Sequence, residues 1–553
     1  MLKKISIFII YLLYHSLSLA QSGLIINEVF YNPNNSTLSS YEYIELYNNS
    51  ASSINLTQYT IQINSNNLKL EEIRIAPKQY IIITSAEARN ELERYGNICT
   101  AERWFALSNT SATVRVKKDE VIIDEVTYQN NWHNSTTQRN GGFSLERINP
   151  NWMCNTQQNW ATSANPMGST PGKMNAVYND KLNPILEISS FEIKNKQVTL
   201  FLNTSLNLIE NIKKDNFELS DNQNKTIEVH ADASKHTLTL TFEQDLSNQK
   251  TYSLLIKNLQ ICNLPIQPLS LTLFKQYEVA HNDILINEIL FNPKVGGVDF
   301  LELYNRTNNP INLQYWKIGN RTITQDLLLI EPLDFIVLTT NKNILTTQYP
   351  NAIANNIFQV SSLPSFPNQQ GYATLISNLN TLVDSLYYNA KMHYPLMVNE
   401  KGISLERQSY LAETNSIGNF KSASTIVGGA TPGYQNSSNV ENFIKKNNIF
   451  LTSKILSPNN DFHEDFLEIN YELISPDYMM NATIFDEKGR VINRLIRQQK
   501  VGDKGKITWD GKGENGTEST AGHYILKVEL FSSNGDKFNF KTAFVLTYNT
   551  LSY

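Results

Sequence analysis

The chain has 553 residues, which is too long for one hydrophobic core, so several domains are expected. Hydrophobic residues make up 41% of it, charged residues 18%, and the formal net charge is −5. Because the positive charge forms no long run, these values exclude nucleic-acid binding through a basic surface that extends over the whole chain. A local basic patch is still possible.

The first twenty residues have the pattern of a secretory signal peptide. Lys3 and Lys4 precede an apolar run at residues 5–13, and small residues end at Ala20, before Gln21. A membrane anchor is the alternative, but the apolar run is short for a span. No later stretch reaches the roughly 18 apolar residues of a spanning helix. We therefore predict an exported protein whose mature chain, after removal of residues 1–20, has no transmembrane segment.

One stretch of sequence occurs twice. Residues 26–33 recur at 286–293, and residues 43–48 recur at 300–305. The copies lie 260 positions apart at Asn27 and Asn287 but 257 apart at Glu45 and Glu302, so the second copy lacks three residues of the intervening loop. The loops concerned are residues 34–42 and 294–299.

The end of each copy also matches. His133 corresponds to His393, and both copies close with a Thr-Pro-Gly turn, at residues 170–172 and 431–433. Such agreement predicts duplicated domains. The repeat markers are Asn27, Glu28, Glu45, Asn48, Asp124, Glu146 and Arg147 in the first copy, and Asn287, Glu288, Glu302, Asn305, Asp384, Glu406 and Arg407 in the second.

Short runs of β-branched and aromatic residues, broken by Asn, Ser, Pro and Gly, fill the first copy. They predict strands at 43–47, 59–63, 80–84, 113–116 and 121–126, with one helix-compatible segment at 86–95. Turn signals at such intervals are typical of an all-β sandwich.

These motifs resemble the lamin-tail domain in its bacterial, secreted form. The resemblance rests on the Ile-Asn-Glu opening, the strand at 43–48, the Ser-Leu-Glu-Arg motif and the Thr-Pro-Gly ending. It covers residues 23–175 and 283–436. It implies immunoglobulin-like β-sandwiches with a binding or tethering role and no known catalytic site.

Two further domains complete the prediction of tandem immunoglobulin-like β-sandwiches. Residues 184–277 contain alternating strands at 198–202, 237–242 and 252–256 and resemble a bacterial Ig-like domain. Residues 448–549 resemble the Ig-like domain of the flagellar hook-capping protein. They are also similar to type IX secretion signals of Gram-negative bacteria, which implies the cell surface or release. The periplasm is the alternative.

Three cysteines are present. Cys99 and Cys154 both lie in the first copy, and the second copy has Gln359 and Thr414 in their places. Their joint absence predicts a Cys99–Cys154 disulfide formed in an oxidising compartment. Two unrelated buried thiols are the alternative. Cys262 would then be left over as a small core residue.

The duplicated acidic residues and histidines are the candidate chemistry. Paired carboxylates with a histidine could serve acid–base catalysis or hold a divalent cation. The structural interpretation is favoured. Glu45 points away from Ile44 and Leu46 on a strand, so it is expected to be solvated or paired across strands. Glu146 and Arg147 suit caps or ion pairs that fix the closing strand. Asn27 and Asn48, with their counterparts, suit turns. No catalytic residue is predicted.

Acidic loops in the last domain offer weak calcium candidates, Asp461, Asp465 and Asp510. Solvated turns are the favoured interpretation, because the loop spacing that calcium ligands need is not met. No cofactor is therefore predicted, with calcium as the alternative.

The sequence thus predicts a non-catalytic surface or periplasmic scaffold or adhesion protein that binds a protein or a surface polysaccharide. Binding would use sandwich-end loops or exposed strand edges. The differing loops 34–42 and 294–299 are the first place to look for partners. One alternative is a secreted metal-dependent hydrolase of the nuclease or phosphatase kind, and another is a nucleic-acid tether. The net charge argues against the tether.

Overall fold

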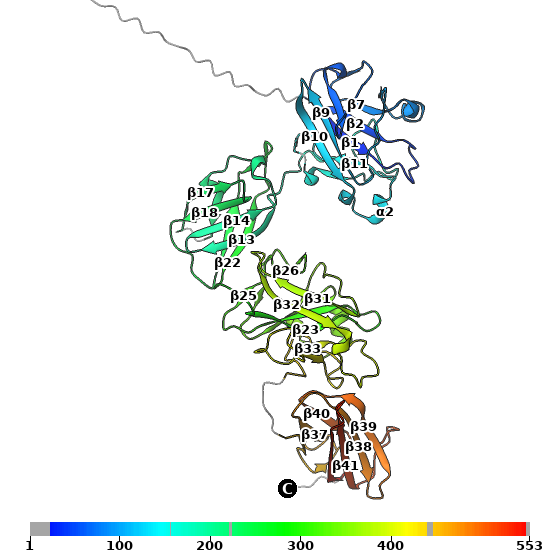
Figure 1. The fold of residues 1–553 in the computed structure, drawn as a ribbon, viewed down its shortest axis with the longest axis vertical. Helices are drawn as coiled ribbons and strands as arrows, with labels where there is room; N and C mark the ends of the chain where they lie inside the picture. The colour runs from blue at the N-terminus through cyan, green and yellow to red at the C-terminus, as the bar shows by residue number, and fades with distance from the viewer. Residues whose placement is uncertain (1–22, 155, 221–223, 440–445, 549–553) are drawn as a thin grey trace, which may run out of the picture.

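The computed structural model describes residues 23–154, 156–220, 224–439 and 446–548. Strands dominate, as the all-β prediction requires. Among the described residues every sheet stays within one of four groups of strands, which we call units 1 to 4 (Figure 1). The predicted signal peptide, residues 1–20, lies outside the described residues. No helix in the described part of the chain is long and apolar enough to cross a membrane.

Unit 1 is a sandwich of a six-stranded sheet, ordered β12-β11-β1-β2-β7-β8, and a four-stranded sheet, ordered β10-β9-β4-β5. Its main core lies between them, and a smaller cluster around Phe30 and Leu92 covers the outer face of the larger sheet. Its elements are β1 Leu24–Phe30, β2 Tyr43–Asn48, β3 Ile54–Asn55, β4 Thr60–Ile63, β5 Asn66–Leu68, β6 Arg74–Ile75, β7 Tyr80–Ser85, α1 Arg89–Leu92, β8 Ile98–Ala101, β9 Ser111–Lys118, β10 Val121–Gln129, α2 Thr136–Arg139, β11 Leu145–Arg147 and β12 Trp160–Thr162.

Unit 3 repeats this plan, with sheets ordered β30-β29-β24-β23-β33-β34 and β27-β26-β31-β32. Its main core and its smaller outer cluster correspond to those of unit 1. Its elements are β23 Ile284–Leu290, β24 Phe300–Asn305, β25 Ile311–Asn312, β26 Lys317–Ile318, β27 Arg321–Thr322, β28 Leu329–Ile330, β29 Phe335–Thr339, α3 Lys342–Gln348, β30 Ile357–Gln359, β31 Gln370–Ile376, β32 Leu382–Asn389, β33 Leu405–Arg407 and β34 Phe420–Ser422.

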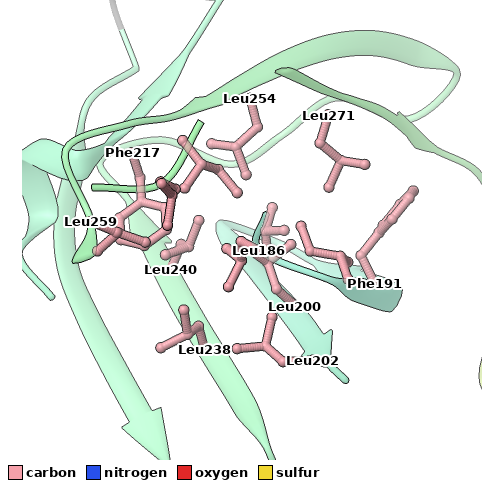
Figure 2. Close-up of a cluster of buried hydrophobic side chains, with 14 of the residues drawn as sticks. Leu186, Phe191, Leu200, Leu202, Phe217, Leu238, Leu240, Leu254, Leu259 and Leu271 are labelled. Carbon is pink, nitrogen blue, oxygen red and sulfur yellow. The ribbon is translucent and has the colours of Figure 1, made fainter. Parts of the chain in front are cut away.

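Unit 2 consists of three sheets, ordered β13-β14-β18-β17, β15-β20-β21 and β16-β19-β22, around one leucine-rich core (Figure 2). Alternation on β14 and β19 places Val198, Leu200, Leu254 and Ile256 in that core. Its strands are β13 Ile188–Lys194, β14 Gln197–Leu202, β15 Ile209–Glu210, β16 Phe217–Leu219, β17 Thr226–Asp232, β18 Thr237–Phe242, β19 Lys250–Ile256, β20 Gln260–Ile261, β21 Leu264–Pro265 and β22 Leu269–Lys275.

Unit 4 packs a three-stranded sheet, β35-β37-β40, against a five-stranded sheet, β36-β42-β41-β38-β39. Trp509 is fully buried between them, with Tyr524 and Phe544 against its ring. Its strands are β35 Asn448–Leu451, β36 Ile455–Leu456, β37 Leu467–Glu472, β38 Met479–Asp486, β39 Val491–Lys500, β40 Lys504–Trp509, β41 Gly522–Phe531 and β42 Lys537–Leu546.

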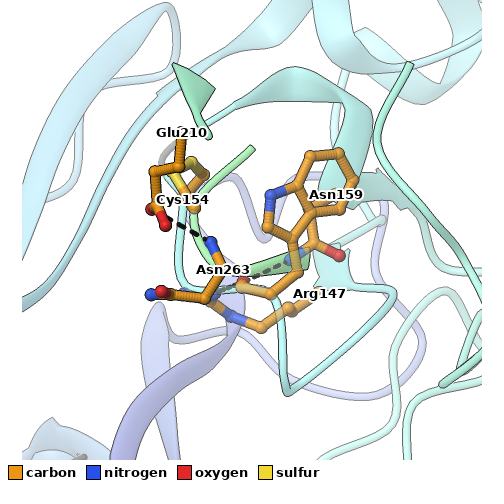
Figure 3. The surroundings of a disulfide bond; sticks show 7 residues. Arg147, Cys154, Asn159, Glu210 and Asn263 are labelled. Atoms are coloured by element: carbon orange, nitrogen blue, oxygen red, sulfur yellow. Dashed lines mark hydrogen bonds between the residues drawn. A yellow bond between two sulfur atoms is a disulfide. The ribbon is translucent and has the colours of Figure 1, made fainter. Parts of the chain in front are cut away.

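The predicted Cys99–Cys154 disulfide is wrong. Cys154 bonds to Cys262, with a Cα–Cα distance of 5.8 Å, and so joins unit 1 covalently to unit 2 (Figure 3). Cys154 and its neighbour Trp152 pack into the core of unit 2, whereas Cys99 stays a free thiol in the core of unit 1. Cysteine spacing alone could not reveal a bond between two units.

The junction of units 3 and 4 is built from hydrogen bonds around one lysine. Lys500, at the end of β39, is fully buried, and its Nζ donates to Ser422 O of unit 3 at 3.2 Å. The backbone N–H of Thr425 donates to Lys500 O at 3.0 Å. Lys421 and Asp477 add an ion pair of 2.8 Å. Burial lowers the pKa of Lys500 to about 8.

Candidate functional site: two rows of buried glutamates

Three glutamates stand side by side on neighbouring strands in each repeated unit. Glu28 on β1 pairs in register with Glu45 on β2 and with Glu146 on β11. In unit 3, Glu288 on β23 pairs in the same way with Glu302 on β24 and Glu406 on β33. All six side chains are completely buried. We call these sets the glutamate rows.

A β-bulge shapes the centre of each row. The register of β1 against β2 shifts between Ile26 and Glu28, and the register of β23 against β24 shifts between Ile286 and Glu288. The extra residue of a bulge re-aims the side chains beside it. Asn27 consequently donates from Nδ2 to Glu45 Oε1 at 2.8 Å. Asn27 therefore supports the row and not a turn, contrary to the expectation from sequence.

The row of unit 1 binds the segment that follows the sandwich, residues 168–178, which we call the closing segment. The backbone N–H groups of Thr170 and Gly172 donate to Glu28 Oε1, at 2.9 Å, and to Glu45 Oε2. The Thr170 hydroxyl donates to Glu146 Oε1 at 2.7 Å. The N–H of Val177 donates to Glu146 Oε2 at 3.1 Å. Every row carboxylate therefore contacts the closing segment.

Unit 3 repeats this arrangement with its closing segment at residues 429–439. Thr431 donates from its N–H to Glu288 Oε1 at 2.9 Å and from its hydroxyl to Glu406 Oε1 at 2.8 Å. The N–H of Gly433 donates to Glu302 Oε2 at 2.6 Å, and that of Ser438 to Glu406 Oε2 at 2.9 Å. Of the two expectations for Glu45, solvation is wrong, because the closing segment covers that face of the sheet, whereas a partner across strands is present in Asn27 of β1.

An asparagine locks each closing segment to the bulge. Asn175 Nδ2 donates to Asn27 O at 3.0 Å and to Arg147 O at 2.8 Å. Asn436 makes the corresponding bonds to Asn287 O and Arg407 O. The sequence interpretation missed both residues. Asn175 and Asn436 lie 261 positions apart, as the two Thr-Pro-Gly turns do, and this shared spacing is the signal that could have revealed them.

Burial favours the neutral form of the central glutamates. It raises the pKa of Glu28 to about 7 and that of Glu288 to about 8, and the neighbouring Glu146 and Glu406 charges add to the effect. The pKa values of Glu45 and Glu302 are also raised, first by burial and then by Glu28 and Glu288. A proton on the central glutamate of a row is therefore favoured near neutral pH, and this proton relieves the repulsion between adjacent carboxylates.

A buried ion pair lies beside each row. Arg147 donates to Asp124 Oδ2 at 2.6 Å, and Arg407 donates to Asp384 Oδ2 at 3.2 Å. Each arginine also donates from Nε to a backbone oxygen of the bulged strand, Ile26 O or Ile286 O. These pairs tie the end of the sandwich to its first strand.

The histidines are not partners of the glutamates. His133 Nδ1 hydrogen-bonds the Thr162 hydroxyl at 2.9 Å, and His393 Nδ1 that of Ser422 at 3.0 Å. Burial lowers the pKa of both imidazoles to about 4, so both are neutral at neutral pH. The acid–base combination of glutamate and histidine considered from sequence is thus not assembled.

Other candidate residues serve turns. Asn48 Nδ2 donates to three carbonyl oxygens, including Ile75 O at 3.0 Å, and Asn305 does the same at Ile330 O. Asp465 accepts backbone N–H groups of Asn460, at 2.7 Å, and Phe462, at 2.9 Å.

The other two calcium candidates have similar partners. Asp461 accepts the His463 N–H at 2.9 Å, and Asp510 pairs with Lys512 at 3.3 Å. In the described part of the chain no three His, Cys, Asp or Glu side chains are grouped to hold a metal ion. Calcium binding stays an untested alternative.

Comparison with known families identifies the repeat. The family model "Lamin Tail Domain" matches residues 18–130 and 278–390, which end before Glu146 and Glu406. None of the curated proteins compared with the chain is significantly similar to it.

Solved structures give only distant likenesses. FlgD from P. aeruginosa is 18% identical, covers 19% of this chain and 78% of its own, and has a TM-score of 0.14. CopC from Methylosinus trichosporium OB3b is 17% identical, covers 18% and 93%, and has a TM-score of 0.13. A tetra-tandem repeat of a large adhesion protein is 10% identical, covers 95% and 99%, and scores 0.14. Scores this low carry no argument about function.

The fold and the family match together define an all-β protein of tandem immunoglobulin-like sandwiches. Its first and third units contain lamin tail domains, as the sequence motifs predict. The comparisons show no catalytic family.

Proposed function

We propose that the chain is an exported, non-catalytic scaffold whose linked sandwiches present binding surfaces to a protein or a surface polysaccharide. The observation that carries the proposal is that the glutamate rows form hydrogen bonds within their own units. Each of the twelve row carboxyl oxygens lies within hydrogen-bond distance of a donor of its own unit, and the hydroxyls of Thr170 and Thr431 are each shared between two of these oxygens. Because these carboxylates are buried and engaged, they are structural groups that are unsuited to activating a water molecule.

The junctions favour the same role. The Cys154–Cys262 bond and the buried Lys500 hold successive units together, which a spacer or scaffold needs and a solitary binding module does not. A disulfide between units also fits the oxidising compartment implied by an export signal. Type IX export is the route we propose, with the periplasm as the alternative location.

Partners would meet the exposed loops. Val295, in the shorter loop 294–299, is 84% exposed, whereas Leu38 in the longer loop 34–42 is buried against the outer cluster of unit 1. The two copies therefore offer different chemistry at equivalent ends. Substitution of the exposed Val295 by alanine is expected to leave folding intact and to reduce binding to cells or to an isolated partner.

The experiment is fractionation of the native host with mass spectrometry of the mature termini, combined with hydrolysis assays on the purified chain. We expect a chain that begins near Gln21 on the surface or in the periplasm and that cleaves neither DNA nor phosphate esters with added divalent metal. A cytoplasmic, unprocessed chain would contradict export. Hydrolysis that Glu45→Ala and Glu302→Ala both abolish would establish the enzyme alternative.

A further inference from the structure

A cleft of about 410 Å³ lies between units 2 and 3. Its walls come from three places: the end of β13 at residues 191–194, the connection between the units at residues 274–281, and the loop of unit 3 at residues 377–383. Residues 312, 314 and 316 form its floor on the side of unit 3. Volumes of this size and a position between domains are common for ligand sites in proteins.

Direct contacts between the units hold the walls in place. The backbone N–H of Asn312 donates to Gln276 Oε1 at 2.7 Å, and Asn378 Nδ2 donates to Phe191 O at 2.7 Å. The Phe191 ring meets Tyr315 edge to face, with centroids 6.1 Å apart. The cleft is therefore formed before any ligand arrives, which lowers the entropy cost of binding.

The lining combines aromatic surface with polar groups that still have bonding capacity. Tyr277 is half exposed in the connection between the units. Trp316 is 1% exposed, and its Nε1–H has no hydrogen-bond partner among the described residues. Within the same residues Gln276 Nε2 and Asn378 Oδ1 also make no hydrogen bond. Because that N–H is itself buried, a ligand in the cleft would form its hydrogen bonds with the free amide atoms of Gln276 and Asn378.

The cleft has no excess of positive charge. Glu192 and Lys194 form an ion pair of 2.7 Å, and the other ionisable lining residues are Glu278 and His281. A cleft for a nucleotide, a phosphate or an acidic polymer would need an excess of positive charge. The ligand that fits is therefore neutral, with a flat apolar face for Tyr277 and with hydroxyl groups that can both donate and accept hydrogen bonds.

We propose that this cleft binds a neutral oligosaccharide. Sugar rings present such a flat face of C–H groups, edged by hydroxyl groups that match free amide atoms. This inference rests on the proposed function, because it names the chemical class of the partner.

The test is isothermal titration calorimetry of the full mature chain with neutral tetrasaccharides of glucose, mannose and N-acetylglucosamine. We expect at least one to bind. Tyr277→Ala removes the stacking surface, and Leu379→Trp fills the cleft from a lining side chain that is 42% exposed. Each is expected to weaken that binding at least tenfold. The matched control is Tyr372→Ala, because Tyr372 is 69% exposed on unit 3 but does not line the cleft.

Three outcomes would overturn the inference. These are no binding of any tetrasaccharide, equal binding by wild type and both cleft variants, or binding of a proline-rich or acidic peptide at the cleft in place of the sugars. Circular dichroism and unfolding of each variant show whether a loss reflects misfolding, and Leu379→Trp provides an independent check if Tyr277→Ala fails to fold. Hydrolysis of a bound sugar would refute the non-catalytic function and leave the cleft as its site.

Discussion

Units 1 and 3 share a fold and a glutamate row, yet they differ at one position beside the buried ion pair. In unit 3 the hydroxyl of Thr414 donates to Asp384 Oδ1 at 2.6 Å and accepts from Arg407. In unit 1 that place is Cys154, which bonds to Cys262, and Asp124 Oδ1 has no hydrogen-bond partner among the described residues. Burial accordingly raises the pKa of Asp124. The difference shows how one substitution converts an internal hydrogen bond into a covalent link to the next unit.

The largest effect is expected from breaking the ion pair itself. Arg147→Met and Arg407→Met each leave an aspartate buried without its cation, which typically costs about 3–5 kcal/mol. The loss should be larger in unit 1, since Thr414 still donates to Asp384 in unit 3. Urea unfolding followed by hydrogen exchange mass spectrometry assigns the loss to each unit. Arg490→Met, at an exposed pair in unit 4, is the control.

Removing the disulfide is the next largest change. Cys154→Ala with Cys262→Ser should destabilise the joined units by about 2–4 kcal/mol. Cys154→Thr with Cys262→Ser should recover about 1 kcal/mol of this, because the new hydroxyl can donate to Asp124 Oδ1 as Thr414 does to Asp384. Equal stabilities of the two double variants would contradict the equivalence of these positions.

The two rows should respond differently to pH. A carboxyl group whose pKa is raised on folding holds its proton more tightly in the folded state. The free energy of unfolding therefore falls as pH rises from 4.5 to the folded pKa, by about 1.4 kcal/mol per pKa unit. That fall ends near pH 7 for Glu28 and near pH 8 for Glu288.

The effect of the glutamate rows on stability is best measured between pH 6.5 and pH 8. Below pH 6.5, the lowered pKa values of His133 and His393 make the free energy of unfolding rise with pH, which opposes the effect of the glutamates. Above pH 8, the lowered pKa of Lys500 has the same opposing effect. Between these two limits unit 3 should lose more stability than unit 1, and Glu288→Gln should remove much of the loss. Unfolding midpoints of each unit, measured at both pH values, check the difference.

The smallest effect is expected from the threonines that bridge the rows. Thr170→Val and Thr431→Val remove a hydroxyl that donates to a buried carboxyl group, at a cost of about 1 kcal/mol, the net contribution of a typical hydrogen bond. The backbone N–H of each residue still donates to its glutamate, so the closing segment should stay bound. Thr425→Val, at the junction of units 3 and 4, serves as the comparison.

The strands could be predicted from the sequence because alternation and turn residues are local signals. The predicted strand at 237–242 coincides with β18, while the predicted helix at 86–95 contains a four-residue α1 after a short turn of 3-10 helix. The burial of Glu45 could not be predicted, since alternation assigns it to the face that is usually wet. A segment more than one hundred residues later covers that face. The partner of Cys154 likewise depended on how two units meet.

Hydrogen exchange of the closing segments tests the central claim most directly, namely that the rows serve to hold these segments. In Glu302→Ala, amides in residues 429–439 should exchange at least tenfold faster, while amides of β31 and β32 keep their protection. Glu45→Ala should do the same at residues 168–178. Unchanged exchange of the closing segments in both variants would contradict the account.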